Sequence, residues 1–162
     1  MDTGLYFEEY ADDWTFETEA ATILDEHVRA FVQLHGFKTP TYTDPAYMQA
    51  AYGGRMVPGM LVMCTAEGLV MNAGVTRRRG IFLMELTPRF RKPVYAGDTI
   101  LNRIRFKSKR LTSRPDRGVV VTAHQVITNR GDVAIEYDSV RMIRTRLFEE
   151  PAEQATPGTS DS

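Results

Sequence analysis

The sequence predicts an α+β domain in which an antiparallel sheet wraps around a long buried helix. Residues 60–71 are apolar on nearly every face of a helix, which predicts a helix that is covered on all sides. Four segments rich in β-branched and aromatic residues then follow one another, as expected for an antiparallel sheet. Because nothing else in the chain can cover the apolar helix, we expect it to lie on this sheet.

The length of the chain fits one domain with its own core. It has 162 residues, enough to bury a sizeable core without a metal or a disulfide. We assign residues 1–148 to this domain. Residues 149–162 are acidic and rich in Pro, Ser, Thr and Gly, so we expect them to be a disordered tail.

The part of the chain that precedes the apolar helix predicts one shorter helix and a long loop. Residues 4–16 are rich in aromatic side chains and are expected to lie against the body. Thr22 is suited to cap an amphipathic helix that ends at His35, where a glycine stops the run. Prolines and glycines in residues 37–58 forbid a long regular element, so at most a single helical turn is expected around residues 46–51.

Turn-forming residues separate the strands of the predicted sheet. Asn129 to Asp132 supply a hairpin turn between the last two strands. Residues 95–98 turn the chain before the second strand, and Pro93 interrupts the ladder ahead of that turn. The predicted strands span residues 81–87, 99–106, 119–128 and 133–144.

Composition and charge exclude several classes of protein. The 20 Lys and Arg residues against 21 Asp and Glu residues give a net charge of −1, far from the basic excess of a nucleic-acid-binding protein. The single cysteine, Cys64, excludes an intrachain disulfide, and three scattered histidines have no metal-ligand spacing. Without a leader-like N-terminus or a membrane-spanning run, we expect a cytoplasmic protein without a membrane segment.

Three stretches, in this order along the chain, narrow the interpretation further. Residues 4–10 read Gly-Leu-Tyr-Phe-Glu-Glu-Tyr, residues 40–61 hold Pro-Thr-Tyr-Thr-Asp-Pro and then Tyr-Gly-Gly-Arg-Met-Val-Pro-Gly-Met, and residues 90–99 read Phe-Arg-Lys-Pro-Val-Tyr-Ala-Gly-Asp-Thr. This ordered set resembles the MaoC-like dehydratases and the (R)-specific enoyl-CoA hydratases. The resemblance implies a hot-dog fold, a homodimer or higher homo-oligomer, and hydration or dehydration of a 2-enoyl-CoA or 3-hydroxyacyl-CoA thioester. It implies no cofactor beyond the coenzyme A of the substrate.

One loop departs from the pattern of this family. Active members carry Gly-Asp-x-Asn-Pro-x-His, whose Asp and His activate water and transfer the proton. Here Phe37 stands at the Asp position and Tyr42 at the His position. Phenylalanine does not titrate, and an ordinary tyrosine pKa of about 10 makes a poor base near neutral pH. The tyrosine form resembles the non-catalytic half of two-part dehydratases.

The candidate catalytic residues lie in and around this loop. Gly59 begins the apolar helix, where free N–H groups can stabilise the negative charge that develops on a thioester carbonyl. Tyr42, Asp44 and His35 are the candidates for a replaced acid/base pair. Glu67 lies within the apolar helix and needs a partner, for which an Arg across a subunit interface is one possibility.

Several basic residues are candidates for binding the phosphates of coenzyme A. They are Arg55, Lys107, Lys109 and Arg110, with the run of residues 77–79 as an alternative. The leading hypothesis is therefore an acyl-CoA hydratase or dehydratase. The alternatives are a catalytically silent acyl-CoA-binding subunit that needs a second hydratase subunit, and a hot-dog thioesterase that uses Asp44 or Glu67.

Overall fold

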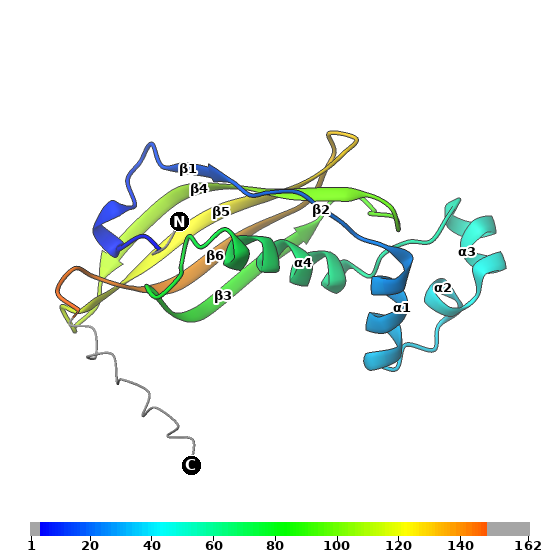
Figure 1. Cartoon of the computed structure of the whole chain (residues 1–162), viewed down its shortest axis with the longest axis horizontal. Helices are drawn as coiled ribbons and strands as arrows, with labels where there is room; N and C mark the ends of the chain where they lie inside the picture. The colour runs from blue at the N-terminus through cyan, green and yellow to red at the C-terminus, as the bar shows by residue number, and fades with distance from the viewer. Residues whose placement is uncertain (1–3, 149–162) are drawn as a thin grey trace, which may run out of the picture.

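Six strands form one antiparallel sheet in the computed structural model, which describes residues 4–148 (Figure 1). The sheet order is β1-β4-β5-β6-β3, and β2 pairs with β4 beside β1. The four long strands confirm the four that the sequence predicts. The strands are β1 (Thr15–Glu17), β2 (Ala21–Thr22), β3 (Gly80–Phe90), β4 (Thr99–Leu111), β5 (Arg117–Thr128) and β6 (Val133–Arg144). The two short strands were not predicted, because two or three residues are too few to display an alternating pattern.

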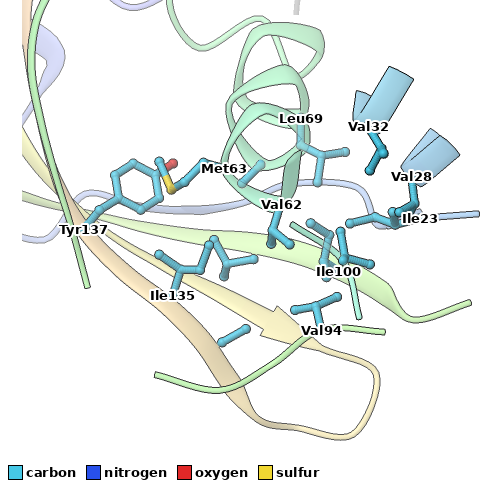
Figure 2. Packing of buried hydrophobic residues seen from close by; sticks show 14 residues of the cluster. Ile23, Val28, Val32, Val62, Met63, Leu69, Val94, Ile100, Ile135 and Tyr137 are labelled. Atoms are coloured by element: carbon cyan, nitrogen blue, oxygen red, sulfur yellow. The ribbon is translucent and has the colours of Figure 1, made fainter. Parts of the chain in front are cut away.

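Helix α4 (Gly59–Asn72) lies on one face of this sheet, as the sequence predicts. Figure 2 shows Val62 and Met63 of α4 among side chains of the sheet that include Ile100, Ile135 and Tyr137. All five are at most 3% exposed. Each such side chain contributes about 1.5–3 kcal/mol by leaving water, so this contact is a main source of the stability of the fold.

The prediction that this helix is buried on every side is wrong for the single chain. Met60 is 56% exposed and Met71 is 45% exposed, and Cys64 between them is also exposed. These residues form a stripe along the side of α4 that the sheet of its own chain leaves uncovered. The sheet is a single layer, so it covers only the side of the helix that faces it.

Helix α1 (Asp25–Leu34) begins later than the predicted cap. Thr22 belongs to β2, where its hydroxyl lies 2.8 Å from that of Thr99. The N-cap is Leu24, whose backbone N–H donates to Nδ1 of His27 at 3.1 Å. The prediction of a Thr22 cap is therefore wrong, because pairing with β4 holds this residue in an extended conformation. The predicted end is confirmed, since His35 is the C-cap of the helix.

The proline-rich loop contains more helix than the sequence predicts. Helix α2 (Pro40–Thr43) makes one turn, and α3 (Pro45–Tyr52) is a helix of eight residues instead of the single turn expected. In both helices the proline is the first helical residue. An N–H group at this position would have no acceptor within the helix, so its absence in proline costs no hydrogen bond. Figure 1 shows α1, α2 and α3 grouped beyond one end of the sheet.

The aromatic N-terminal segment lies against the body, as predicted. It holds a 3-10 helix, η1 (Phe7–Glu9), and its residues Phe7 and Tyr10 are buried beside Val120 and Ile143. The predicted tail lies outside the described residues, so the boundary at residue 148 stays a prediction. Within residues 4–148, no helix is long and apolar enough to cross a membrane.

Candidate functional site

A cavity of about 370 Å³ lies where the N-terminus of α4 meets α2 and the segment that follows β3. Its walls are mainly apolar, and they combine residues from four parts of the chain that are distant in sequence. The lining residues are Tyr42, Met56, Val57, Gly59, Val62, Phe90, Arg91, Lys92, Pro93, Val94 and Ile135. Two of the predicted catalytic residues, Tyr42 and Gly59, are therefore brought together in one cavity.

Gly59 supplies hydrogen-bond donors to the wall of this cavity. It is the first residue of α4, and the helix has its first intrahelical bonds at Leu61 and Val62, whose N–H groups donate to Pro58 O at 2.9 and 3.2 Å. The N–H groups of Gly59 and Met60 have no carbonyl acceptor within the helix. The helix dipole is positive at this end. This end of the cavity therefore favours an oxygen atom with negative charge.

Tyr42 supplies a hydroxyl group that stays protonated near neutral pH. Partial burial raises the pKa of Tyr42 above its usual value, and the neighbouring Tyr52 raises the pKa further. The ring centroid of Tyr42 lies 5.5 Å from that of Phe37. Phe37 and Tyr42 thus form an aromatic pair, and a protonated Tyr42 hydroxyl can donate a hydrogen bond.

The other two catalytic candidates have structural roles and do not line the cavity. Oδ1 of Asp44 accepts from the N–H groups of Ala46 at 2.9 Å and Tyr47 at 3.1 Å, so Asp44 is the N-cap of α3. His35 ends α1 with its ring centroid 4.4 Å from that of Phe31. Neither side chain lies beside Gly59 in the way that an acid or a base would require.

The four basic residues predicted to bind phosphate also lie outside the cavity lining. Arg55 forms an ion pair with Asp25 of α1. Nζ of Lys107 lies 2.6 Å from Asp138 of β6 in the same sheet, and Arg110 is an exposed residue of β4. The sequence does not reveal these pairings, because each partner is distant along the chain.

Lys109 fastens the N-terminal segment to the sheet. Its Nζ donates to the carbonyl oxygens of Phe7 at 3.1 Å, Glu8 at 3.1 Å and Tyr10 at 2.6 Å. A lysine ammonium has three donors, and these bonds use all three. Lys109 is therefore committed to the fold, and the cationic residues at the cavity are Arg91 and Lys92, which the sequence analysis did not select.

Glu67 belongs to a polar network inside the core. It accepts a hydrogen bond of 2.7 Å from the Tyr137 hydroxyl and forms an ion pair with Arg141 of β6. The suggestion of an Arg partner across a subunit interface is thus wrong, because the partner belongs to the same chain. The network continues from Tyr137 to Asn102 at 2.7 Å and from Asn102 to His124 at 3.3 Å.

His124 is the ionisable residue at the far end of this network. Its ring stacks on that of Tyr137 at 4.3 Å, and burial lowers the pKa of His124 to about 3. Burial and the nearby Glu67 carboxylate raise the pKa of Tyr137 well above its usual value. The network is satisfied internally and separate from the Gly59 cavity, so it specifies the packing of α4 on the sheet.

A larger groove, of about 760 Å³, crosses the face of the sheet opposite α4. Two ion pairs lie along it, Arg103 with Glu17 at 2.9 Å and Lys107 with Asp138 at 2.6 Å. Exposed ion pairs of this kind are ordinary features of a solvated sheet face. Among residues 4–148, no group of three or more His, Cys, Asp or Glu residues could hold a metal ion.

Comparisons with known proteins agree with this architecture. A family model described as "FAS1-like, dehydratase domain region" matches residues 13–137. No curated protein sequence matches significantly.

Three solved structures illustrate the similarity of the fold. A MaoC-like dehydratase from Rhodospirillum rubrum has 20% identity and a TM-score of 0.79, over 90% of this chain and all of the other. Rv0216 from Mycobacterium tuberculosis, described as a double hotdog fold, has 18% identity and a TM-score of 0.80, over 91% of this chain and 46% of that one. The HadBC (3R-hydroxyacyl-ACP dehydratase) complex from M. tuberculosis has 20% identity and a TM-score of 0.64, over 82% and 98%. At such identities the similarity establishes the fold, and it confirms the predicted α+β hot-dog fold.

Proposed function

The chain belongs to the family of FAS1-like dehydratase domain regions, and from this premise we propose that it is the acyl-thioester-binding half of a two-chain dehydratase. The substrate class is a 3-hydroxyacyl or 2-enoyl thioester. The observation that carries the proposal is the composition of the cavity at α4. Its described lining offers the helix N-terminus at Gly59 and a protonated Tyr42 hydroxyl, but no carboxylate and no imidazole.

The chemistry of dehydration explains why this lining suits binding. A base removes the proton from C2 of the thioester, an acid protonates the hydroxyl that leaves C3, and the carbonyl oxygen gains enolate character. The N–H groups at the start of α4 are donors for that oxygen, and Tyr42 can add a hydroxyl donor. The proton transfers need a pair of titratable groups, one acid and one base. We assign this pair to a second chain.

The apolar side chains of the cavity wall, including one from the first turn of α4, suit an acyl chain. Val57, Val62 and Ile135 are buried apolar residues of the wall. A short acyl chain that displaces water from such a surface gains about 25 cal/mol for each Å² of apolar area removed from water. We therefore expect the apolar wall to bind the acyl group and the N–H groups at the start of α4 to bind the neighbouring carbonyl. An acyl thioester has these two parts side by side.

An exposed apolar surface offers a place for the second chain to dock. It combines the α4 stripe of Met60, Cys64 and Met71 with the consecutive residues 81–84 of β3, all of which are at least 36% exposed. Among residues 4–148, β3 is an edge strand, so one row of its backbone N–H and C=O groups has no neighbouring strand there. We propose that a second hot-dog chain covers this surface, as a homodimer when the chain is alone and as a mixed dimer with a catalytic partner.

The test is to measure binding and turnover with the purified chain. We expect calorimetry to detect binding of butyryl-CoA, and we expect no hydration of crotonyl-CoA above a heat-inactivated control. Hydration by the chain alone would contradict the silent-subunit proposal and favour a replaced acid/base pair. Release of free coenzyme A without hydration would identify a thioesterase instead, and absence of binding would refute an acyl-thioester function.

A further inference from the structure

The outer face of the sheet, which is the face opposite α4, carries charges in rows that run across the strands. One row crosses β1, β4, β5, β6 and β3 in that order and consists of Glu17, Arg103, Gln125, Glu136 and Arg89. All of these residues line the groove on this face. From β1 to β3 the row is therefore negative, positive, neutral, negative and positive. Read from β3 to β1, it has the opposite sign at every charged position.

The next row along the strands has the same property. Arg105 of β4 and Asp138 of β6 lie on either side of Ala123 of β5. The outer strands β1 and β3 contribute the uncharged residues Thr15 and Thr87 to this row. Residues two apart on a strand point to the same face, so both rows belong to one surface. In both rows the sign of the charge thus reverses about the central strand β5.

A surface with this symmetry is complementary to a copy of itself. We propose that a second copy of this chain packs on the outer face, sheet against sheet, about a two-fold axis parallel to β5. Such an axis places β4 of each chain over β6 of the other, and β1 over β3. Arg105 of each chain then faces Asp138 of the other, and the neighbouring row brings Arg103 to Glu136 in the same way. Packed sheets keep their strands within about 30° of each other, so the strands next to the axis stay opposed row to row.

The lengths and the charges of the side chains suit this contact. Packed sheets lie about 10 Å apart, a gap that an arginine from one side and a carboxylate from the other can bridge. Within the described part of the chain, Arg89 and Arg105 form no ion pair. A second copy offers them Glu17 and Asp138, which are 47% and 36% exposed. Each of these carboxylates has one oxygen bonded within its own chain, so the other oxygen can accept from the partner.

The contact lies across the sheet from the α4 stripe, so it is independent of the acyl cavity and of the surface proposed for a catalytic partner. Exposed ion pairs are individually weak, so we expect a dissociation constant of about 0.1 mM at low ionic strength. Salt at about 0.5 M shortens the Debye length to well below 10 Å and should weaken the contact by about tenfold. The contact therefore adds to a tighter association through β3 without replacing it.

Sedimentation of charge-reversal variants tests this contact. The background is Phe82→Glu, which places a charge on the β3 edge, so that a doubling of mass with concentration reports the outer face. We expect the background protein to double its mass between about 10 μM and about 1 mM at low salt. Arg105→Glu and Asp138→Arg, each made in this background, should each abolish the doubling, because like charges then face each other. An equimolar mixture of these two variants should restore it, because opposite charges face each other again at both contacts.

Arg29→Glu is the matched control, because it makes the same change of charge on α1, beyond the end of the sheet, at a side chain that is 69% exposed. This variant should keep the doubling of mass. The same exchange in the neighbouring row, Arg103→Glu mixed with Glu136→Arg, gives a second test that does not depend on the folding of the first two variants. Absence of doubling in the background protein would overturn the contact. Doubling that survives Arg105→Glu would also overturn it, as would a mixture that fails to restore the doubling.

Discussion

A methyl group on Gly59 would lie 2.8 Å from Cε1 of Phe90, closer than carbon atoms approach without displacement. The end of β3 therefore packs against the first residue of α4, and both residues line the acyl cavity. A larger residue at position 59 would therefore require the Phe90 side chain to move.

From this contact we expect Gly59→Ala to weaken binding of butyryl-CoA by about tenfold, because the added methyl group and the displaced Phe90 ring take up space beside the α4 N–H donors. Gly68→Ala is the control, since a methyl group there meets no atom within 4 Å in the same helix. That variant should bind butyryl-CoA as the wild type does. Calorimetry on both proteins is the measurement, and equal affinities in all three proteins would refute a role for the helix start.

The hydroxyl of Tyr42 is expected to contribute to binding and not to act as a base. Tyr42→Phe removes the hydroxyl but keeps the ring that packs beside Phe37. We expect binding of butyryl-CoA to weaken by about fivefold, which is the effect of one hydrogen bond of about 1 kcal/mol. The melting temperature should change little. An unaltered affinity would show that the hydroxyl does not reach the ligand.

Asp44 is expected to stabilise the fold without taking part in chemistry. Asp44→Ala removes the N-cap of α3 and should lower the free energy of unfolding by about 1 kcal/mol. Asp44→Ser keeps a capping oxygen and should restore most of that loss. Denaturant titration checks both values, while binding of butyryl-CoA should remain within about twofold of the wild type. A large loss of binding in the serine variant would assign Asp44 to the site instead.

The stability of the chain should fall as the pH falls, because His124 is buried in its neutral form. Its folded-state pKa of about 3 lies below the usual value of 6.5, so the unfolded chain binds a proton first. This contribution is complete above about pH 6.5 and is lost progressively toward pH 3. Between pH 8 and pH 5 we expect a loss of about 2 kcal/mol from this residue.

Denaturant titrations of His124→Gln measure this contribution. The glutamine side chain can still donate and accept hydrogen bonds toward Thr122 and Asn102, the partners of His124. The variant should show a smaller loss of stability between pH 8 and pH 5. Identical pH dependence in the wild type and the variant would contradict the assignment.

The edge strand β3 is expected to mediate association. Phe82 is 63% exposed on this strand, and Phe82→Glu places a charge within the apolar surface. We expect the wild-type chain to sediment as a dimer at micromolar concentration and the variant as a monomer. Leu111→Glu is the control, because Leu111 is 59% exposed at the end of β4, away from that edge. A wild-type monomer would refute the proposed surface.

Local patterns in the sequence were sufficient to predict the main elements of the fold. Residues 60–71 and the four β-rich segments determined α4 and the four long strands, because continuous apolar character and β-branched runs are local properties. Through the resemblance to a dehydratase family, the sequence also predicts that Phe37 and Tyr42 replace an acid/base pair, and this assignment stays a prediction.

Contacts between distant residues were decided by the tertiary structure alone. Arg55 and Lys109 looked like phosphate ligands, but the fold gives them Asp25 and the N-terminal carbonyl groups as partners. Arg91 and Lys92 stand in a turn-forming stretch, and the fold pairs them with Glu136 and Asp132. The sequence determined the long elements, because their apolar and β-branched patterns depend on neighbours along the chain. The tertiary structure decided which charged side chains are paired within the chain. That depends on which carboxylates and carbonyl groups the packing of α4 against the sheet brings near them.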